Sequence, residues 1–357
     1  MSSKSPESRS AASAGVPEID VAPLFGGPDP ARDAVDARIL EAACGKGFMT
    51  LRGAPLGDAV DEAARARLLR LFSLPADEQR NLWKRNFEPG NPNLYRGWFP
   101  LESGAPRSRE GFEIGPDIDR DLPDAAGDLL YEPSVFPPES LLPGWRAAAR
   151  AYYRAMETLG GKLLCSLSRG LGISEAIFLD AFRDGISTLR LLRYPERDLE
   201  APAQRELESL FTRHAGRRVE LVCLGHVDSG LITILSQCGV PGLQAEAEDG
   251  LFVDVPLVED GFAVNFGGLL SRWTGGRIKA TKHRVVSTGG ERFSIPFFFE
   301  PRPSALIAPL PLEGVQPFEP FLFGDHLWAT TTKFPENLGL AHLRPARAPY
   351  RDPFEAA

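Results

Sequence analysis

The sequence lacks the features of a membrane or secreted protein. No stretch approaches the roughly 18 consecutive apolar residues of a membrane span, and the polar, Ser-rich start has no apolar segment typical of a secretory signal. Only four cysteines occur in 357 residues, and no two form a Cys-x-x-Cys pair. Such sparse cysteine argues against a disulfide framework and favours reduced thiols. We therefore expect a cytoplasmic protein with no membrane partner.

The chain also lacks a basic patch. Its formal net charge is -8 at pH 7, and Lys and Arg are spread along its length. A nucleic-acid-binding surface needs clustered positive charge to neutralise phosphates, so we expect no nucleic-acid partner. What the chain does have is an ordinary globular composition, with 43% hydrophobic and 25% charged residues. That composition is sufficient for a sizeable core.

The first half of the chain is predicted to consist of helices and loops. Residues 1–15 are expected to form a disordered tail, and residues 16–185 a helical and loop-rich region packed on the core. Pro, Gly and Asp punctuate residues 75–138, which indicates long ordered loops. Helical spacing or composition predicts helices over residues 33–44, 59–72, 143–171 and 174–182, and strands are predicted over residues 16–21 and 47–53.

The second half changes to short apolar runs bounded by turn residues. These runs predict strands over residues 187–194, 219–228, 231–235, 251–255, 262–266, 283–287 and 292–300. Strands of this length and spacing indicate a sandwich or barrel. The fold class is therefore predicted to be α+β with a mainly β core over residues 186–305, supporting N-terminal helices, and an extension over residues 306–357.

Three residues of the second half have the pattern of a metal site. His226 and Asp228 lie two positions apart near the end of a predicted strand, where alternate side chains share a face. His283 precedes the strand HRVVS and supplies a third candidate ligand. Two imidazoles and one carboxylate leave coordination positions open, as in non-haem Fe(II) oxygenases, whereas structural zinc prefers four protein ligands. The competing interpretation is that each histidine is an ordinary core or surface residue.

A second pair of residues could bind a carboxylate. Arg292 and Ser294 share a face of the predicted strand RFSIPFFFE. The planar guanidinium binds carboxylates through two hydrogen bonds, and the serine hydroxyl adds a donor. Together they could hold the distal carboxylate of 2-oxoglutarate. The alternatives are an exposed arginine and a structural salt bridge.

Several motifs resemble the 2-oxoglutarate and Fe(II)-dependent oxygenase superfamily, in the branch of isopenicillin N synthase and the plant flavonoid and gibberellin oxygenases. The motifs are HVDSGLITIL, DGLFVDVP, VNFGGLLSRWTGGRIKATKHRV and RFSIPFFFEP, with VPEIDVAPL and GFMTLRG near the start. The resemblance covers nearly the whole chain. It implies a distorted jelly roll, or double-stranded β-helix, with iron held between two sheets.

The resemblance also implies residue roles. His226, Asp228 and His283 match the iron ligands, and Arg292 and Ser294 match the Arg-x-Ser carboxylate clamp. The tyrosine of LLRYP, Tyr194, matches a tyrosine whose hydroxyl joins that clamp. Leu192, Gly268 and Ser229 depart from residues common in the family at their positions. Isopenicillin N synthase-like enzymes use the clamp for the substrate's own carboxylate, so 2-oxoglutarate and substrate remain alternative ligands.

We therefore expect an enzyme that uses Fe(II), 2-oxoglutarate and O2 to hydroxylate or desaturate a small molecule, releasing succinate and CO2. The alternatives are an isopenicillin N synthase-like oxidase that uses no 2-oxoglutarate, a non-catalytic jelly-roll binding protein and, least favoured, a zinc hydrolase. Candidate substrate contacts are Tyr95, Arg96, Trp98 and Phe298, and Arg96 hints at an acidic substrate. Residues 321–334 are expected to form a helix covering one end of the site. The sequence does not indicate an oligomeric state.

Overall fold

The computed structural model describes residues 8–9, 15–101, 109–122, 127–196, 210–287, 289–346 and 350–351. The predicted disordered tail, residues 1–15, therefore lies mostly outside the described residues. Within it, Ser8 and Arg9 form the short strand β1, which pairs in parallel with β11 (Phe252–Asp254).

Two curled sheets form the centre of the described structure. One has six strands in the order β1-β11-β10-β13-β8-β7, and the other has eight in the order β2-β3-β12-β9-β14-β6-β5-β4. The first sheet contains β10 (Leu243–Glu246), β13 (His283–Ser287), β8 (Arg217–His226) and β7 (Phe211–His214) besides β1 and β11. The second contains β2 (Glu18–Asp20), β3 (Phe48–Arg52), β12 (Phe262–Phe266), β9 (Ile232–Ser236), β14 (Arg292–Phe299), β6 (Thr188–Tyr194), β5 (Glu110–Ile114) and β4 (Gly97–Phe99). A separate pair is formed by β15 (Leu306–Ile307) and β16 (Phe321–Leu322).

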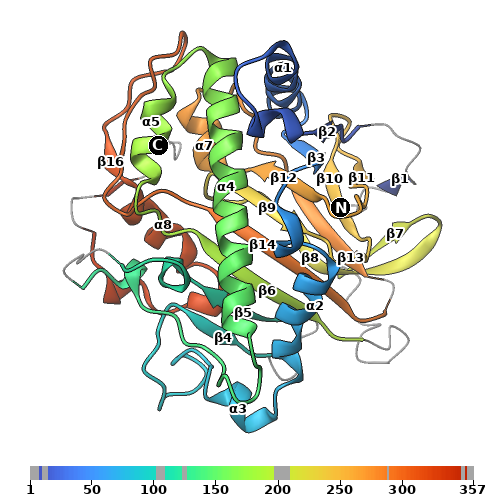
Figure 1. Ribbon diagram of the computed structural model, residues 1–357, viewed down its shortest axis with the longest axis vertical. Helices are drawn as coiled ribbons and strands as arrows, with labels where there is room; N and C mark the ends of the chain where they lie inside the picture. The colour runs from blue at the N-terminus through green and yellow to red at the C-terminus, as the bar shows by residue number, and fades with distance from the viewer. Residues whose placement is uncertain are drawn as a thin grey trace, which may run out of the picture.

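Helices pack around the eight-stranded sheet. The α-helices are α1 (Pro30–Gly45), α2 (Glu62–Leu69), α3 (Ala76–Arg80), α4 (Trp145–Leu171), α5 (Glu175–Phe182), α7 (Gly268–Trp273) and α8 (Phe323–Thr331). Of these, α1 and α4 are in contact with the strands of this sheet. The longest, α4, runs across this sheet and contacts β9 and β14 (Figure 1). Its buried face joins α1, α2 and the sheet in the largest hydrophobic cluster of the described residues.

Helix α4 is continuous through its Gly160-Gly161 pair. The helix approaches the sheet closely at this point, because a Cβ atom on Gly160 would lie 2.6 Å from Cδ1 of Phe299. Glycine at this position is therefore explained by close packing of the helix on β14.

A smaller hydrophobic cluster fills the space between the two sheets. Its residues come from both of them: Phe48, Phe99, Leu192, Tyr194 and Ala263 from the eight-stranded sheet and Val222, Leu243, Ala245 and Val285 from the six-stranded sheet, with Val255 beside them. The sheets therefore face each other, as in a jelly roll. The mainly β core with supporting helices confirms the predicted fold class.

The structure adds strands that the sequence did not predict. Within residues 75–138, predicted as loops, β4 and β5 extend the eight-stranded sheet beyond β6. The N-terminal region thus contributes to the central sheet as well as packing on it. Among the described residues, no helix is long and apolar enough to cross a membrane.

Candidate metal centre

The three predicted metal ligands lie together at one end of the six-stranded sheet. His226 ends β8 and His283 begins β13, and the antiparallel register places these two residues opposite each other. Asp228 lies beyond the end of β8, in the connection to β9, so the prediction that it shares a strand face with His226 is wrong. The chain leaves the strand at His226, and the turn brings the carboxylate back toward both imidazoles.

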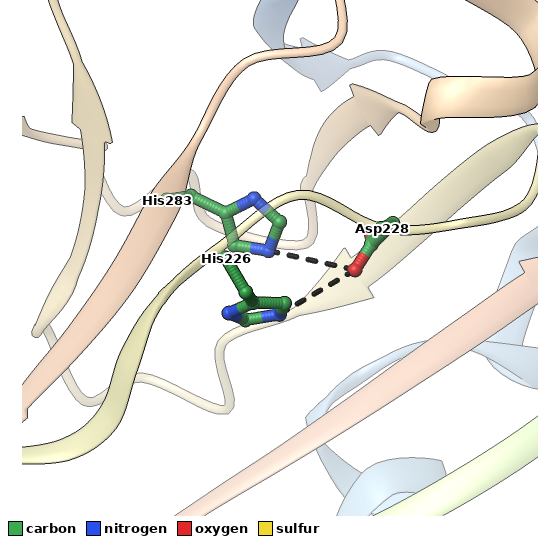
Figure 2. Close-up of side chains that lie close together, drawn as sticks. All are labelled: His226, Asp228 and His283. Carbon is green, nitrogen blue, oxygen red and sulfur yellow. Dashed lines mark ion pairs between the residues drawn. The ribbon is translucent and has the colours of Figure 1, made fainter. Parts of the chain in front are cut away.

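The side chains converge on one point, as Figure 2 shows. Oδ1 of Asp228 lies 3.5 Å from Nε2 of His226 and 3.7 Å from Nε2 of His283. The three candidate ligand atoms all lie within 4.8 Å of one another. Metal bonds to imidazole and carboxylate are about 2.0–2.2 Å long, so one ion between these atoms could reach all three.

Backbone carbonyl groups fix the orientation of both imidazoles. Nδ1 of His226 lies 2.9 Å from the carbonyl oxygen of Leu224, and Nδ1 of His283 lies 3.2 Å from that of Thr281. A carbonyl oxygen only accepts hydrogen bonds, so each Nδ1 carries the proton. In the neutral rings the Nε2 lone pairs are then directed toward the site, as metal-ligating histidines require.

The carboxylate of Asp228 is fixed from the opposite sheet. Its Oδ2 accepts hydrogen bonds from Oγ1 of Thr233 at 2.6 Å and from Nδ2 of Asn265 at 2.7 Å. Thr233 lies on β9 and Asn265 on β12, which are neighbouring strands. Oδ1 thus remains available to face the imidazoles. We did not identify Thr233 and Asn265 from the sequence, although both lie in the motifs that carried the resemblance.

The three groups perturb each other's protonation. Burial would raise the pKa of Asp228, but the two histidines and Thr233 lower it well below its usual range. Burial would lower the pKa of His226, but Asp228 and Cys223 raise it to about 11. The pKa of His283 is lowered, mainly by burial. A metal ion would therefore displace a proton from His226, since only the unprotonated nitrogen can bind.

The predicted carboxylate clamp lies on the facing sheet. Arg292 begins β14 and is paired in register with Tyr194 of β6, whose ring lies 5.2 Å from the guanidinium carbon. Arg292, Ser294 and Tyr194 are all buried. None of the three guanidinium nitrogens of Arg292 has a hydrogen-bond partner among the described residues. Arginine stays charged at any ordinary pH, so this is an unpaired buried cation.

Sequence and structure comparisons agree on the family. Residues 191–301 match the 2OG-Fe(II) oxygenase superfamily, and residues 16–139 match the non-haem dioxygenase in morphine synthesis N-terminal family. Isopenicillin N synthase of Streptomyces clavuligerus is 32% identical over 326 residues, which cover 88% of this chain and 94% of that one. The chain belongs to the 2OG-Fe(II) oxygenase superfamily. It is accordingly an oxidoreductase of the oxygenase type.

This oxygenase also resembles 2-oxoglutarate-dependent dioxygenases in sequence and solved complexes with alpha-KG in structure. The 2-oxoglutarate-dependent dioxygenase citB of Monascus ruber is 32% identical, with 84% of this chain and 88% of that one covered. A full-length Neurospora crassa protein solved in complex with alpha-KG and 5-formyluracil superposes with a TM-score of 0.70 at 26% identity, covering 87% of this chain and 94% of that one. The predicted cofactors of the family, Fe(II), 2-oxoglutarate and O2, agree with these matches.

The oxygenase has a cavity of about 390 Å³ beside the candidate metal ligands. His226 and Asp228 line it. The C-terminal extension forms part of its wall through Leu327 of α8 and Phe334, so a helix lies beside the site as predicted, but it spans Phe323–Thr331 and not the whole of residues 321–334. Arg292 lines a separate cavity of about 250 Å³.

Two of the four predicted substrate residues line the cavity. Tyr95 and Phe298 do so, whereas Arg96 and Trp98 do not. Arg96 is fully buried and donates hydrogen bonds to Oγ1 of Thr188 and to a backbone carbonyl. Trp98 is buried in the main core and donates to a carboxylate on β5. The positions of Arg96 and Trp98 therefore give no support for a role in substrate binding, and the hint of an acidic substrate taken from Arg96 loses its basis.

A largely buried ion cluster on the cavity wall was not predicted. Glu113 on β5 accepts a hydrogen bond of 2.5 Å from Nζ of Lys84 and one of 2.8 Å from Nε of Arg190. Arg190 also forms an ion pair of 3.1 Å with Glu336 of the C-terminal extension. Burial would raise the pKa of Glu113, but Arg190 and Lys84 lower it to about 2. These four charges are thus satisfied within the protein.

Proposed function

We propose that this oxygenase is a 2-oxoglutarate-dependent dioxygenase that hydroxylates or desaturates a small molecule. In the hydroxylation, 2-oxoglutarate loses CO2 and becomes succinate. One atom of O2 enters succinate and the other enters the substrate, so the electrons from 2-oxoglutarate and from one C–H bond balance the reduction of O2. The cytoplasmic location predicted from the sparse cysteines stays a prediction.

The candidate ligands fit Fe(II). Nε2 of His226, Oδ1 of Asp228 and Nε2 of His283 would hold the ion, because their Nδ1 and Oδ2 atoms are already occupied by the protein. Two imidazoles and one carboxylate are the facial donor set of non-haem Fe(II) oxygenases. When bound, the ion would supply the position at which O2 and the keto acid react. Phe298 and Leu327 form apolar parts of the cavity wall and help to exclude water from it.

The observation that carries the proposal is the unpaired guanidinium of Arg292. Arg292 is 2% exposed, and its nitrogens have no hydrogen-bond partner among the described residues. A buried charge without a partner costs several kcal/mol or more, so its burial is explained best by an anionic ligand. The distal carboxylate of 2-oxoglutarate matches the planar guanidinium, with Ser294 and Tyr194 as neighbouring hydroxyl groups.

A second candidate function is an oxidase in which Arg292 and Ser294 bind the carboxylate of the substrate. The 32% identity to isopenicillin N synthase favours it. Binding of 2-oxoglutarate distinguishes the two candidates, because the oxidase takes all its electrons from the substrate and releases no succinate.

The test is to add Fe(II) and then 2-oxoglutarate to the protein without oxygen and to record the visible spectrum. Chelation of iron by a keto acid gives a weak charge-transfer band, and admission of O2 should then release succinate. We expect both signals in the wild type and neither in His226→Ala. Arg292→Gln should need a higher concentration of 2-oxoglutarate for the band.

A matched control is Arg217→Gln, which makes the same substitution at an exposed residue of β8 and should behave as the wild type. Iron binding without the band and without succinate would reject 2-oxoglutarate as co-substrate and support the oxidase. Unchanged affinity for 2-oxoglutarate in Arg292→Gln would reject the assignment of the clamp.

A further inference from the structure

One glutamate on the cavity wall, unlike Glu113 and Glu336, has no charged partner among the described residues. Glu300 follows β14, is 6% exposed and lines the cavity beside the candidate metal ligands. Among the described residues, Oε2 of Glu300 has no hydrogen-bond partner and no cation forms an ion pair with this side chain. Burial raises the pKa of Glu300 well above its ordinary value, and Asp228 raises it further, while the backbone N–H of Leu231 opposes both. A buried carboxyl group with an unsatisfied oxygen costs stability unless a ligand completes it.

The same cavity contains a partly buried positive group that also has no ion-pair partner among the described residues. Arg109 lines the cavity immediately before β5, and no described residue forms a hydrogen bond or ion pair with it. Burial would lower the pKa of Arg109, but negative neighbours raise it, so the guanidinium stays charged. Glu300 and Arg109 do not form an ion pair with each other. One cavity therefore exposes two groups of opposite charge type that the protein leaves separate.

The neighbouring ion cluster shows that the lack of an ion-pair partner is confined to Glu300 and Arg109 on the described cavity wall. Glu113, Arg190 and Glu336 also line the cavity, and each is paired at 3.1 Å or less. The protein thus pairs three of the five glutamates and arginines on the described wall, and only Glu300 and Arg109 are left without an ion-pair partner there.

We propose that the substrate is a small zwitterion of the amino-acid type, whose amine binds Glu300 and whose carboxylate binds Arg109. The inference rests on the proposed function, since it names the substrate class of the same site. An ammonium group supplies the donors that Oε2 of Glu300 lacks, and a carboxylate matches the guanidinium fork of Arg109. The cavity of about 390 Å³ suits a small molecule.

The first experiment measures succinate release by the Fe(II)-loaded enzyme with 2-oxoglutarate and each of the common amino acids. For every amino acid that stimulates release, the deaminated acid and the decarboxylated amine are measured alongside it. We expect loss of either charged group to lower kcat/KM roughly 10- to 150-fold, the range for one hydrogen bond to a charged group. Stimulation by none of the amino acids, or equal rates with the singly charged analogues, would overturn the inference.

Two variants test the assignment of the charges. Glu300→Gln should reduce the preference for the amino acid over its deaminated acid and keep the preference over the amine. Arg109→Gln should do the reverse. A structural defect would lower all rates alike, so uniform losses in both variants would overturn the assignment.

Failure of the inference is distinguishable from failure of the proposed function. The charge-transfer band and the slow release of succinate without any substrate belong to 2-oxoglutarate chemistry alone. If both are present and no zwitterion is preferred, the substrate class is wrong and the proposed function stands. If neither is present in the wild type, the proposed function fails.

Stability gives a readout that needs no substrate. We expect Glu300→Gln to leave the melting temperature of the metal-free protein unchanged or to raise it, because it removes an unsatisfied buried acid. The matched control is Glu113→Gln, the same change at a paired glutamate of the same wall, which should lower it. An equal decrease in the two variants would show that Glu300 is structural and would overturn the proposal.

Discussion

Two arginines on neighbouring strands are in opposite states. Arg190 on β6 is bound by Glu113 and Glu336, whereas Arg292 on β14 has no hydrogen-bond partner among the described residues. Both belong to the eight-stranded sheet, so the architecture alone does not explain the difference. The pairing of Arg190 stabilises the fold, and the isolation of Arg292 costs stability that a ligand can restore. The absence of a partner for its buried charge is therefore the feature on which the proposed role of Arg292 rests.

The largest expected effect is a loss of folding stability when Glu113, the partner of Arg190, is replaced. Glu113→Gln leaves Lys84 and Arg190 with reduced compensation and should lower the free energy of unfolding by about 3–5 kcal/mol. Arg292→Gln should leave the free energy of unfolding unchanged or raise it, because it removes a buried charge that has no hydrogen-bond partner among the described residues. Urea denaturation of the metal-free proteins measures both. A large loss in Arg292→Gln would mean that Arg292 is paired within the protein after all.

The next largest effect is the stabilisation of the folded protein by bound 2-oxoglutarate, which should depend on Arg292 and not on Arg190. With Fe(II) present and oxygen excluded, 2-oxoglutarate at 100 times its dissociation constant should stabilise the protein by about 2.7 kcal/mol. The gain should fall in Arg292→Gln at the same concentration and be retained in the surface control Arg217→Gln. Thermal unfolding measured with and without 2-oxoglutarate gives the result. An undiminished gain in Arg292→Gln would separate the clamp from the co-substrate.

Acid should lower the free energy of unfolding by protonating Glu113, the partner of Arg190. The folded-state pKa of Glu113 is about 2, below its ordinary value of 4.5, so its contribution is present above pH 4.5 and is lost as the pH falls toward 2. By pH 3 the loss from this one group should be about 2 kcal/mol. Unfolding curves between pH 6 and 3 measure it, with Glu113→Gln as the reference. A wild type and variant with the same pH slope would contradict the assignment.

The smallest expected effect is on Fe(II) affinity, because Oδ2 of Asp228 keeps one of its two hydrogen-bond donors when the other is removed. Thr233→Val removes one of two hydrogen bonds to Oδ2 of Asp228 and leaves that from Asn265. We expect Fe(II) affinity to fall on the order of tenfold, the low end of the range for such partners. Anaerobic titration with Fe(II) measures it. No change in affinity would show that Asn265 alone holds the carboxylate in place.

Local patterns predicted the longer helices and most strands of the fold, but not the short helices α3 and α7. Helices α1 and α4 and strands β8, β9 and β11 to β14 follow apolar patterns, and the residues of the triad stand in a recognisable motif, whereas β10 was not predicted. Strands β4 and β5 were missed, because glutamates occupy buried positions on β5 that would read as exposed in an ordinary strand. Those glutamates are buried only because Lys84 and arginines of β6 reach them.

The partners of polar side chains were the part that sequence could not predict. Arg96 and Arg190 look alike as isolated arginines, yet one hydrogen bonds Thr188 inside the core and the other lines the cavity. Likewise, Glu300 and Glu113 differ only in what the folded chain places beside them. Which partner each polar side chain finds depends on contacts between segments that are far apart in the chain.

The C-terminal extension has a consequence for redesign. Leu327, Thr331, Phe334 and Glu336 supply one wall of the cavity, while the candidate iron ligands come from β8, β13 and the connection after β8. The wall and the metal site are thus encoded in separate stretches of the chain. Substitutions in this wall would change which molecules fit without replacing a candidate iron ligand, provided that the carboxylate opposite Arg190 is kept. The extension thus borders the cavity without supplying a candidate iron ligand.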